Sequence, residues 1–98
     1  MKSYDEISQI LSEHLPALQK QFGIARLGVF GSVVRGEQGA ASDVDILVDF
    51  SRPIGLIQFM QCESRLSALV GARVDLVTRK ALKPYIGERI LGEVRYVN

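Results

Sequence analysis

Two groups of residues near the middle of the chain have the types and the spacing that phosphate chemistry requires. Gly31 and Ser32 end one apolar stretch, and Asp43 and Asp45 begin the next. Because side chains alternate along a strand, the two aspartates are expected on one face, about 6–7 Å apart. Two carboxylates this close raise each other's pKa, which a bound cation usually offsets. Oxygen ligands of this kind suit Mg²⁺, which completes its shell with water and substrate phosphate oxygens.

The glycine–serine step offers contacts for those phosphates. Gly31 lets the backbone approach closely, Ser32 has a hydroxyl, and a helix that starts there would present free N–H groups to an anion. Arg35 could contact a triphosphate or simply pair with Glu37, and the sequence leaves both open. Asp75 lies between valine and leucine in an apolar stretch, where an aspartate is disfavoured unless it has a partner such as a metal ion.

Three short strands are predicted to position these acidic residues. Each is an apolar run bounded by turn-forming or charged residues, and together they comprise residues 27–30, 43–50 and 73–77. The second strand contains both Asp43 and Asp45, and the third contains Asp75. Asp49 shares the face of the first two but lies too far along the strand to share one ion with them. We therefore leave Asp49 out of the site.

The segment between the first two strands is predicted to begin with a helical turn over residues 32–35. A loop of small residues follows over residues 36–42, in which Ser42 could cap the turn before Asp43.

Three amphipathic helices complete the secondary structure. The first begins with a capping box formed by Ser3 and Glu6 and ends at Gly23, and Pro16 predicts a kink or a restart inside it. The second runs to Gly71, with Glu63 on its solvated side, and the last begins near Pro84. The apolar positions that mark the second helix are Leu56, Phe59, Met60, Leu66, Leu69 and Val70.

These elements predict an α+β fold in a single domain over residues 1–98. We expect a short mixed sheet, mainly of three strands, with helices on one side and the acidic site open on the other. The 98 residues bury a modest core, and 47% hydrophobic with 23% charged residues is ordinary for a globular protein.

The bulk composition argues against several other classes of protein. A net charge of +1 gives no general basis for direct nucleic-acid binding. Cys62 is the single cysteine, so an internal disulfide is excluded and a reducing, cytoplasmic location is expected. The first residues have no apolar signal core, and no apolar run approaches membrane-spanning length. Secretion and membrane insertion are therefore not expected.

The motif as a whole resembles a known family. Gly31-Ser32, ten further residues and then Asp43-Val44-Asp45 match the signature of the DNA polymerase beta-like nucleotidyltransferase superfamily. The chain is most similar to the smallest members, the minimal nucleotidyltransferases (MNT), and the resemblance extends to residues 73–77. It implies a polymerase beta-like fold and transfer of a nucleoside monophosphate from an NTP, with ATP favoured. It assigns metal binding to Asp43, Asp45 and Asp75. Our own hypothesis is that these aspartates hold two Mg²⁺ ions for catalysis and that Gly31, Ser32 and Arg35 bind the triphosphate.

Minimal nucleotidyltransferases commonly act as antitoxins to HEPN ribonuclease toxins, and some adenylylate a tyrosine of that toxin. The resemblance therefore implies a HEPN partner, a hetero-oligomer and AMP transfer to a hydroxyl, which we expect to be that of a tyrosine. The chain offers no room for the acceptor-binding domain of larger relatives, which also favours a partner that brings the acceptor. Two alternatives remain: an antitoxin that binds nucleotide and blocks the toxin sterically, and a catalytic subunit of a small-molecule nucleotidyltransferase.

Overall fold

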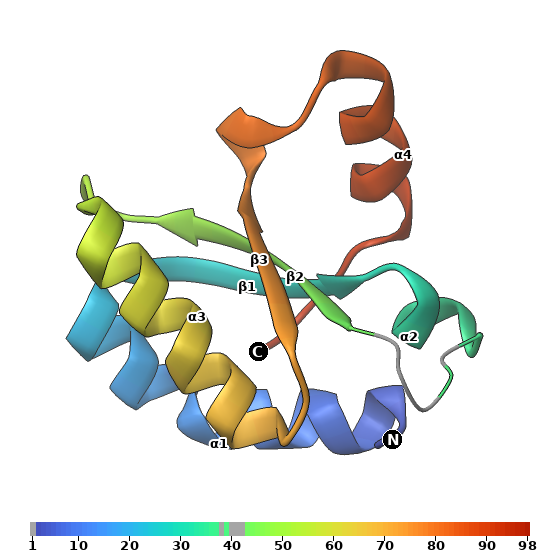
Figure 1. Ribbon diagram of the computed structural model, residues 1–98, viewed down its shortest axis with the longest axis horizontal. Coiled ribbons are helices and arrows are strands. Elements are labelled where there is room, and N and C mark those ends of the chain that lie inside the picture. The colour runs from blue at the N-terminus through green and yellow to red at the C-terminus, as the bar shows by residue number, and fades with distance from the viewer. Residues whose placement is uncertain (1, 38, 40–42) are drawn as a thin grey trace.

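The computed structural model describes residues 2–37, 39 and 43–98 and forms a four-stranded mixed sheet (Figure 1). The strand order is β3-β2-β1-β4, in which β2 and β3 are parallel and the other pairs are antiparallel. The strands are β1 (Ile24–Phe30), β2 (Val44–Phe50), β3 (Val74–Thr78) and β4 (Arg95–Tyr96). The helices are α1 (Tyr4–Phe22), α2 (Ser32–Arg35), α3 (Leu56–Val70), a 3₁₀ turn η1 (Arg79–Ala81) and α4 (Pro84–Glu93). The α+β fold with a short mixed sheet is as predicted.

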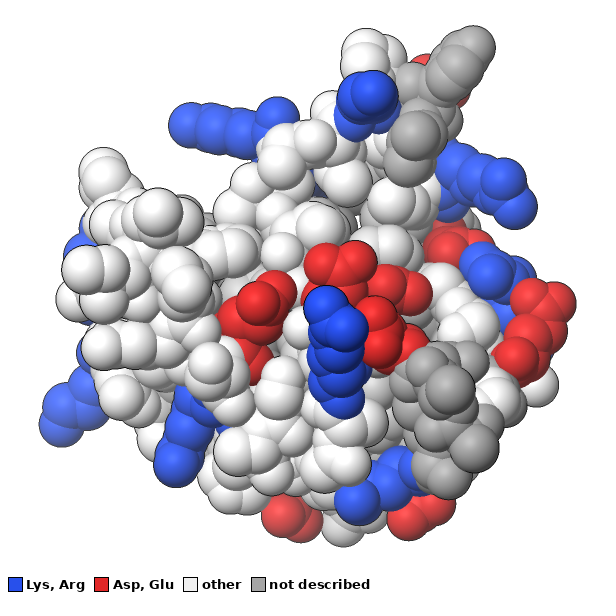
Figure 2. Space-filling view, viewed as in Figure 1, with Lys and Arg blue, Asp and Glu red and all other residues white. Residues whose placement is uncertain are grey.

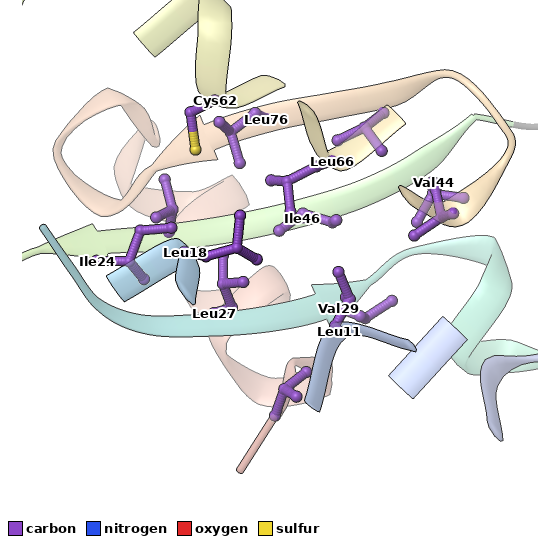
Figure 3. Packing of buried hydrophobic residues seen from close by; sticks show 14 of the residues in the cluster. Leu11, Leu18, Ile24, Leu27, Val29, Val44, Ile46, Cys62, Leu66 and Leu76 are labelled. Atoms are coloured by element: carbon purple, nitrogen blue, oxygen red, sulfur yellow. The ribbon is translucent and has the colours of Figure 1, made fainter. Parts of the chain in front are cut away.

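The hydrophobic core lies between one face of the sheet and the two long helices, α1 and α3. Figure 3 shows side chains of both helices meeting those of β1, β2 and β3. On β2 the core positions are Val44, Ile46 and Val48, which share one face of the strand, and Leu47 on the opposite face is also buried. In Figure 1, α1 and α3 lie together on one side of the molecule, and α4 stands well apart from them.

The sequence predicted the long helices closely. The capping box at the start of α1 is present, with the Ser3 side chain accepting from the Glu6 amide, and Gly23 ends the helix in the left-handed conformation. The restart expected near Pro16 is not present, because α1 is one continuous helix. Pro16 lies on the exposed side, while Leu11 and Leu18 on either side of it are buried in the same core. Packing thus holds the helix together across the missing hydrogen bond.

The fourth strand is a correction to the three-stranded sheet. β4 has two residues, which pair with β1 through Gly28–Tyr96 and Val29–Arg95. Two residues are too few to show any periodicity, so this pairing could not be predicted from the pattern. The last helix, α4, ends at Glu93, so Val94 lies between this helix and β4. Val94 and Tyr96 cover Gly28 so closely that a Cβ there would overlap the Val94 side chain.

Two expectations for α3 were wrong. Leu56 and Met60, placed on the apolar face by their spacing, are 74% and 57% exposed. Glu63, expected in solvent, is half-buried, and its Oε2 accepts a hydrogen bond of 2.9 Å from the Leu76 amide. Ser67 Oγ accepts from the Val74 amide at 3.0 Å. Because β3 is an edge strand, these side chains occupy backbone donors that would otherwise lack a strand partner.

Candidate active site

The parallel pairing of β2 and β3 places two of the predicted acidic residues side by side. Asp45 and Asp75 are direct partners in the register, so both side chains lie on the sheet face opposite the core. Because neighbouring strands are typically about 4.8 Å apart, this pairing places the two backbones close together. Asp43 lies just before β2 and is exposed, as is Asp75, whereas Asp45 is half-buried. Figure 2 shows acidic side chains gathered near the centre of the face that it presents.

The electrostatics of Asp45 reflect this crowding. Burial is the largest cause that raises the pKa of the Asp45 carboxyl, followed by the negative charges of Asp75 and Asp43. Arg35 opposes the rise, and Glu93 adds to it. Carboxylates in such surroundings favour either a proton or a cation.

Gly31 lies directly against Asp45. Gly31 is the residue before α2 and has φ +78°, a conformation that side chains with a Cβ rarely adopt. A Cβ at this position would also overlap the Asp45 carboxylate. Both the turn and the close approach to Asp45 therefore require a glycine at position 31. The turn also brings the Gly31-Ser32 segment, which is predicted to bind phosphate, next to the acidic residues. The predicted helical turn over residues 32–35 is confirmed as α2.

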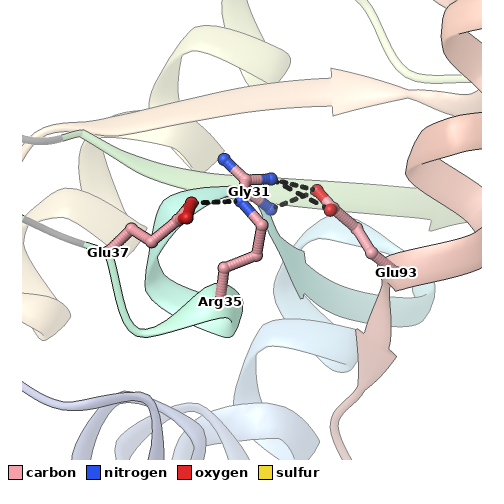
Figure 4. Close-up of polar contacts among 4 residues, drawn as sticks. All are labelled: Gly31, Arg35, Glu37 and Glu93. Carbon is pink, nitrogen blue, oxygen red and sulfur yellow. Dashed lines mark hydrogen bonds and ion pairs between the residues drawn. The ribbon is translucent and has the colours of Figure 1, made fainter.

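Arg35 pairs with two glutamates (Figure 4). Its Nε donates to Glu37 Oε1 at 2.7 Å, and its terminal nitrogen donates to both carboxylate oxygens of Glu93 at 2.9 and 3.1 Å. The pairing with Glu37, one of the two alternatives that the sequence left open, is present, and the pairing with Glu93 is additional. The hydrogen bonds to Glu37 and then to Glu93 raise the pKa of the Arg35 guanidinium.

Glu93 is the residue of this cluster that the sequence did not reveal. Its Oε1 accepts a hydrogen bond of 2.8 Å from the Gly31 amide, 62 residues away in the chain. Burial raises the pKa of the Glu93 carboxyl, but the Gly31 amide and Arg35 together outweigh it, so the pKa is lowered overall. A glutamate at the end of an amphipathic helix carries no pattern that indicates such a contact.

The acidic side chains around Asp45 offer carboxylate oxygens, which are ligands that Mg²⁺ binds. Among the residues that the structure describes, no three acidic, histidine or cysteine side chains converge closely enough to hold an ion together. Asp43, Asp45 and Asp75 thus share one neighbourhood without forming a closed cage. Ser42, expected to cap the turn before Asp43, and most of the predicted loop over residues 36–42 lie outside the described residues.

Asp49, which we left out of the site, has a different environment on the same face of β2. Its Oδ2 accepts hydrogen bonds from Arg26 at 3.2 Å and from Arg79 at 3.3 Å. Arg79 also donates to the Tyr96 hydroxyl at 2.8 Å, and the Arg26 guanidinium lies over the Tyr96 ring. Asp49 therefore belongs to a basic and aromatic cluster further along the sheet.

Comparison with known proteins agrees with this fold. Residues 11–97 match the family described as the nucleotidyltransferase domain. The chain is 48% identical over 97 residues to the protein adenylyltransferase MntA of Thermococcus cleftensis. The aligned region covers 99% of this chain and 98% of the relative. The chain belongs to the nucleotidyltransferase domain family.

Two solved structures show the same fold. One, described as a minimal nucleotidyltransferase, has a TM-score of 0.77 and 36% identity and covers 92% of both chains. The other is a tri-AMPylated Shewanella oneidensis HEPN toxin in complex with an MNT antitoxin, with a TM-score of 0.65 and 16% identity, covering 91% of this chain and 70% of that chain. With these relatives the protein is a nucleotidyltransferase of the minimal type. Within the described residues, no helix is both long enough and apolar enough to cross a membrane.

Proposed function

We propose that this protein transfers AMP from ATP to a hydroxyl group of a partner HEPN ribonuclease toxin, and that it acts as the antitoxin to that toxin. The acceptor we favour is a tyrosine, and the location is the cytoplasm. The observation that carries the proposal is the contact of Gly31 with Asp45, because it brings a turn suited to phosphate against the carboxylate pair Asp45–Asp75. The name of the Thermococcus relative and the AMPylated toxin in the Shewanella complex support the acceptor and the partner.

The residues of the chain can be assigned roles in this transfer. Asp43, Asp45 and Asp75, which do not enclose an ion by themselves, would share Mg²⁺, two ions in our proposal, with oxygens of the substrate phosphates. The Gly31-Ser32 turn with Arg35 would bind the triphosphate. The bound ions would neutralise charge on the phosphates and on the attacking and leaving oxygens. Asp75, which is exposed beside Asp45, would orient the acceptor hydroxyl or take its proton. A bond then forms from the acceptor oxygen to the α-phosphorus, and pyrophosphate leaves.

The transfer can be tested with ATP labelled on the α-phosphate. The protein, Mg²⁺ and a candidate HEPN partner protein are incubated, and label on the partner is measured by gel and mass spectrometry. We expect label on a tyrosine of the partner and loss of its ribonuclease activity. An unlabelled partner that is nevertheless inhibited in a stable complex would contradict the transfer and support steric blocking.

The third hypothesis, a catalytic subunit for small-molecule acceptors, is tested in the same assay. Aminoglycosides and similar hydroxylated compounds replace the partner protein, and release of pyrophosphate is followed. We expect no release above the rate of ATP hydrolysis. Turnover with such an acceptor in the absence of any partner would contradict the antitoxin proposal.

A further inference from the structure

The end of α4 occupies part of the proposed phosphate site. Glu93 is the last residue of α4, and its carboxylate accepts hydrogen bonds from the Gly31 amide and from one side of the Arg35 guanidinium. These are the backbone donor and the cation that the proposed function assigns to the triphosphate. A carboxylate and a phosphate present the same feature to such donors, namely paired oxygens that carry negative charge.

The contact is specific in its geometry. One oxygen, Oε1, accepts from both Gly31 and Arg35, and the second oxygen accepts from the same Arg35 nitrogen. The Glu93 side chain is 22% exposed, so it reaches the turn from a partly enclosed position (Figure 4). A phosphate oxygen that took the Gly31 amide would have to displace Oε1, because an N–H group makes one strong hydrogen bond at a time.

The contact also adds negative charge where charge is already crowded. Glu93 is one of the groups that act unfavourably on the Asp45 carboxylate, together with Asp75 and Asp43. Removal of Glu93 from the turn would free one side of the Arg35 guanidinium, which stays paired with Glu37, and would reduce the repulsion that an incoming triphosphate meets. The same change would loosen the end of α4, whose next residues form β4.

We propose that Glu93 is an internal substitute for the triphosphate, which holds the Gly31–Arg35 site closed until a nucleotide displaces it. This inference rests on the proposed function, because that function places the triphosphate at Gly31 and Arg35. The apparent affinity for nucleotide is then lowered by the fraction of molecules in which Glu93 occupies the site. Nucleotide binding is thereby coupled to the release of α4.

The test compares Glu93→Gln with Glu88→Gln. Glutamine at 93 keeps the length of the side chain and an acceptor for the Gly31 amide but loses the charge that holds Arg35. Glu88 is an exposed residue of the same helix, so its substitution makes the same change in net charge away from the turn. Binding of a non-hydrolysable ATP analogue, and separately of tripolyphosphate, is measured by calorimetry with Mg²⁺.

We expect Glu93→Gln to bind both probes about tenfold more tightly than the unsubstituted protein, since a charge-assisted contact no longer competes. Glu88→Gln should change affinity less than about twofold. Equal or weaker binding by Glu93→Gln overturns the proposal, because a residue that merely orients Arg35 would be needed for binding. This readout requires no transfer: tighter binding without label on any partner would contradict the proposed function alone.

A measurement on the unsubstituted protein makes the test independent of how the variant folds. The carboxyl carbon of Glu93 and the amide of Gly31 are followed by NMR while the ATP analogue is added. Both resonances should shift together as the analogue binds, while the carboxyl carbon of Glu88 stays in place. Binding of the analogue without a change at Glu93 would show that the two do not compete.

Discussion

Asp45 and Asp49 lie on the same face of the same strand, yet their surroundings are opposite. Asp49 is held by Arg26 and Arg79, which compensate its charge. Asp45 has two further aspartates nearby, and its pKa is raised by burial and by their charges. The residue type and the strand face are the same, so neither distinguishes a binding residue from a structural one. Crowded negative charge at Asp45, which Arg35 offsets only in part, marks the candidate site.

The other face of β2 gives a second contrast. Val44, Ile46 and Val48 lie on this face and are completely buried under α1 and α3, whereas the opposite face has Asp45, the buried Leu47 and Asp49. One strand of seven residues therefore stabilises the fold with one face and presents carboxylates with the other. Because the side-chain period is two, substitutions on the two faces should affect stability and activity separately.

The largest effect is expected from Asp45→Asn on transfer. Loss of this carboxylate should lower the rate by about a thousandfold or more, roughly 4 kcal/mol in the barrier, because it removes a proposed metal ligand next to the reacting phosphates. Asp49→Asn, its match on the same face, should keep most of the activity. Initial rates of AMP transfer from labelled ATP measure both. Comparable losses in the two variants would show that the whole face acts together.

The next largest effect is expected on the free energy of unfolding, from a substitution on the face of β2 that is buried under α1 and α3. Ile46→Ala should lower the free energy of unfolding by about 3 kcal/mol, since it leaves a cavity among fully buried neighbours. Ile57→Ala on α3, where the side chain is 72% exposed, should change it by less than about 0.5 kcal/mol. Urea unfolding followed by circular dichroism gives both values. A small loss at Ile46 would mean that the core is looser than the structure shows.

A smaller effect is expected where α3 reaches the edge of β3. Glu63→Ala removes the acceptor of the Leu76 amide and should lower the free energy of unfolding by about 1–2 kcal/mol. Ser64→Ala changes the next, exposed residue of the helix and serves as the control. Urea unfolding again measures the difference, and hydrogen exchange at the Leu76 amide should quicken only in the first variant. Unchanged exchange there would argue that Glu63 does not protect the edge strand.

The smallest effect concerns stability and pH at Asp45, without divalent cations. A carboxyl whose pKa is raised by folding binds more protons in the folded state, so stability falls as pH rises from the ordinary carboxyl pKa through the raised one. Asp45→Asn should therefore be more stable than the unsubstituted protein at pH 7, and this gain should disappear near pH 3. Unfolding in urea with EDTA at both pH values tests this. A variant that is less stable at pH 7 would contradict the sign of the shift.

Much of the fold followed from local chemistry. The capping box at Ser3 and Glu6, the turn at Gly31 and the alternation of β2 are determined by neighbours in the chain, and the structure has them as expected. The grouping of acidic residues with the Gly31-Ser32 step was also predicted, since the motif places them at the ends of adjoining strands. These features depend on hydrogen bonds and side-chain periods within a few residues.

The sequence by itself determined the strand faces, the helix ends and the types of residue that could bind phosphate and metal. The tertiary structure decided which strands are neighbours and therefore that Asp75 lies in register with Asp45. It also decided that Glu93 takes the Gly31 amide, that two residues form β4, and that Leu56 and Met60 stay exposed. The physical reason is distance along the chain: contacts between residues far apart in sequence depend on how the elements pack, and no local pattern encodes them.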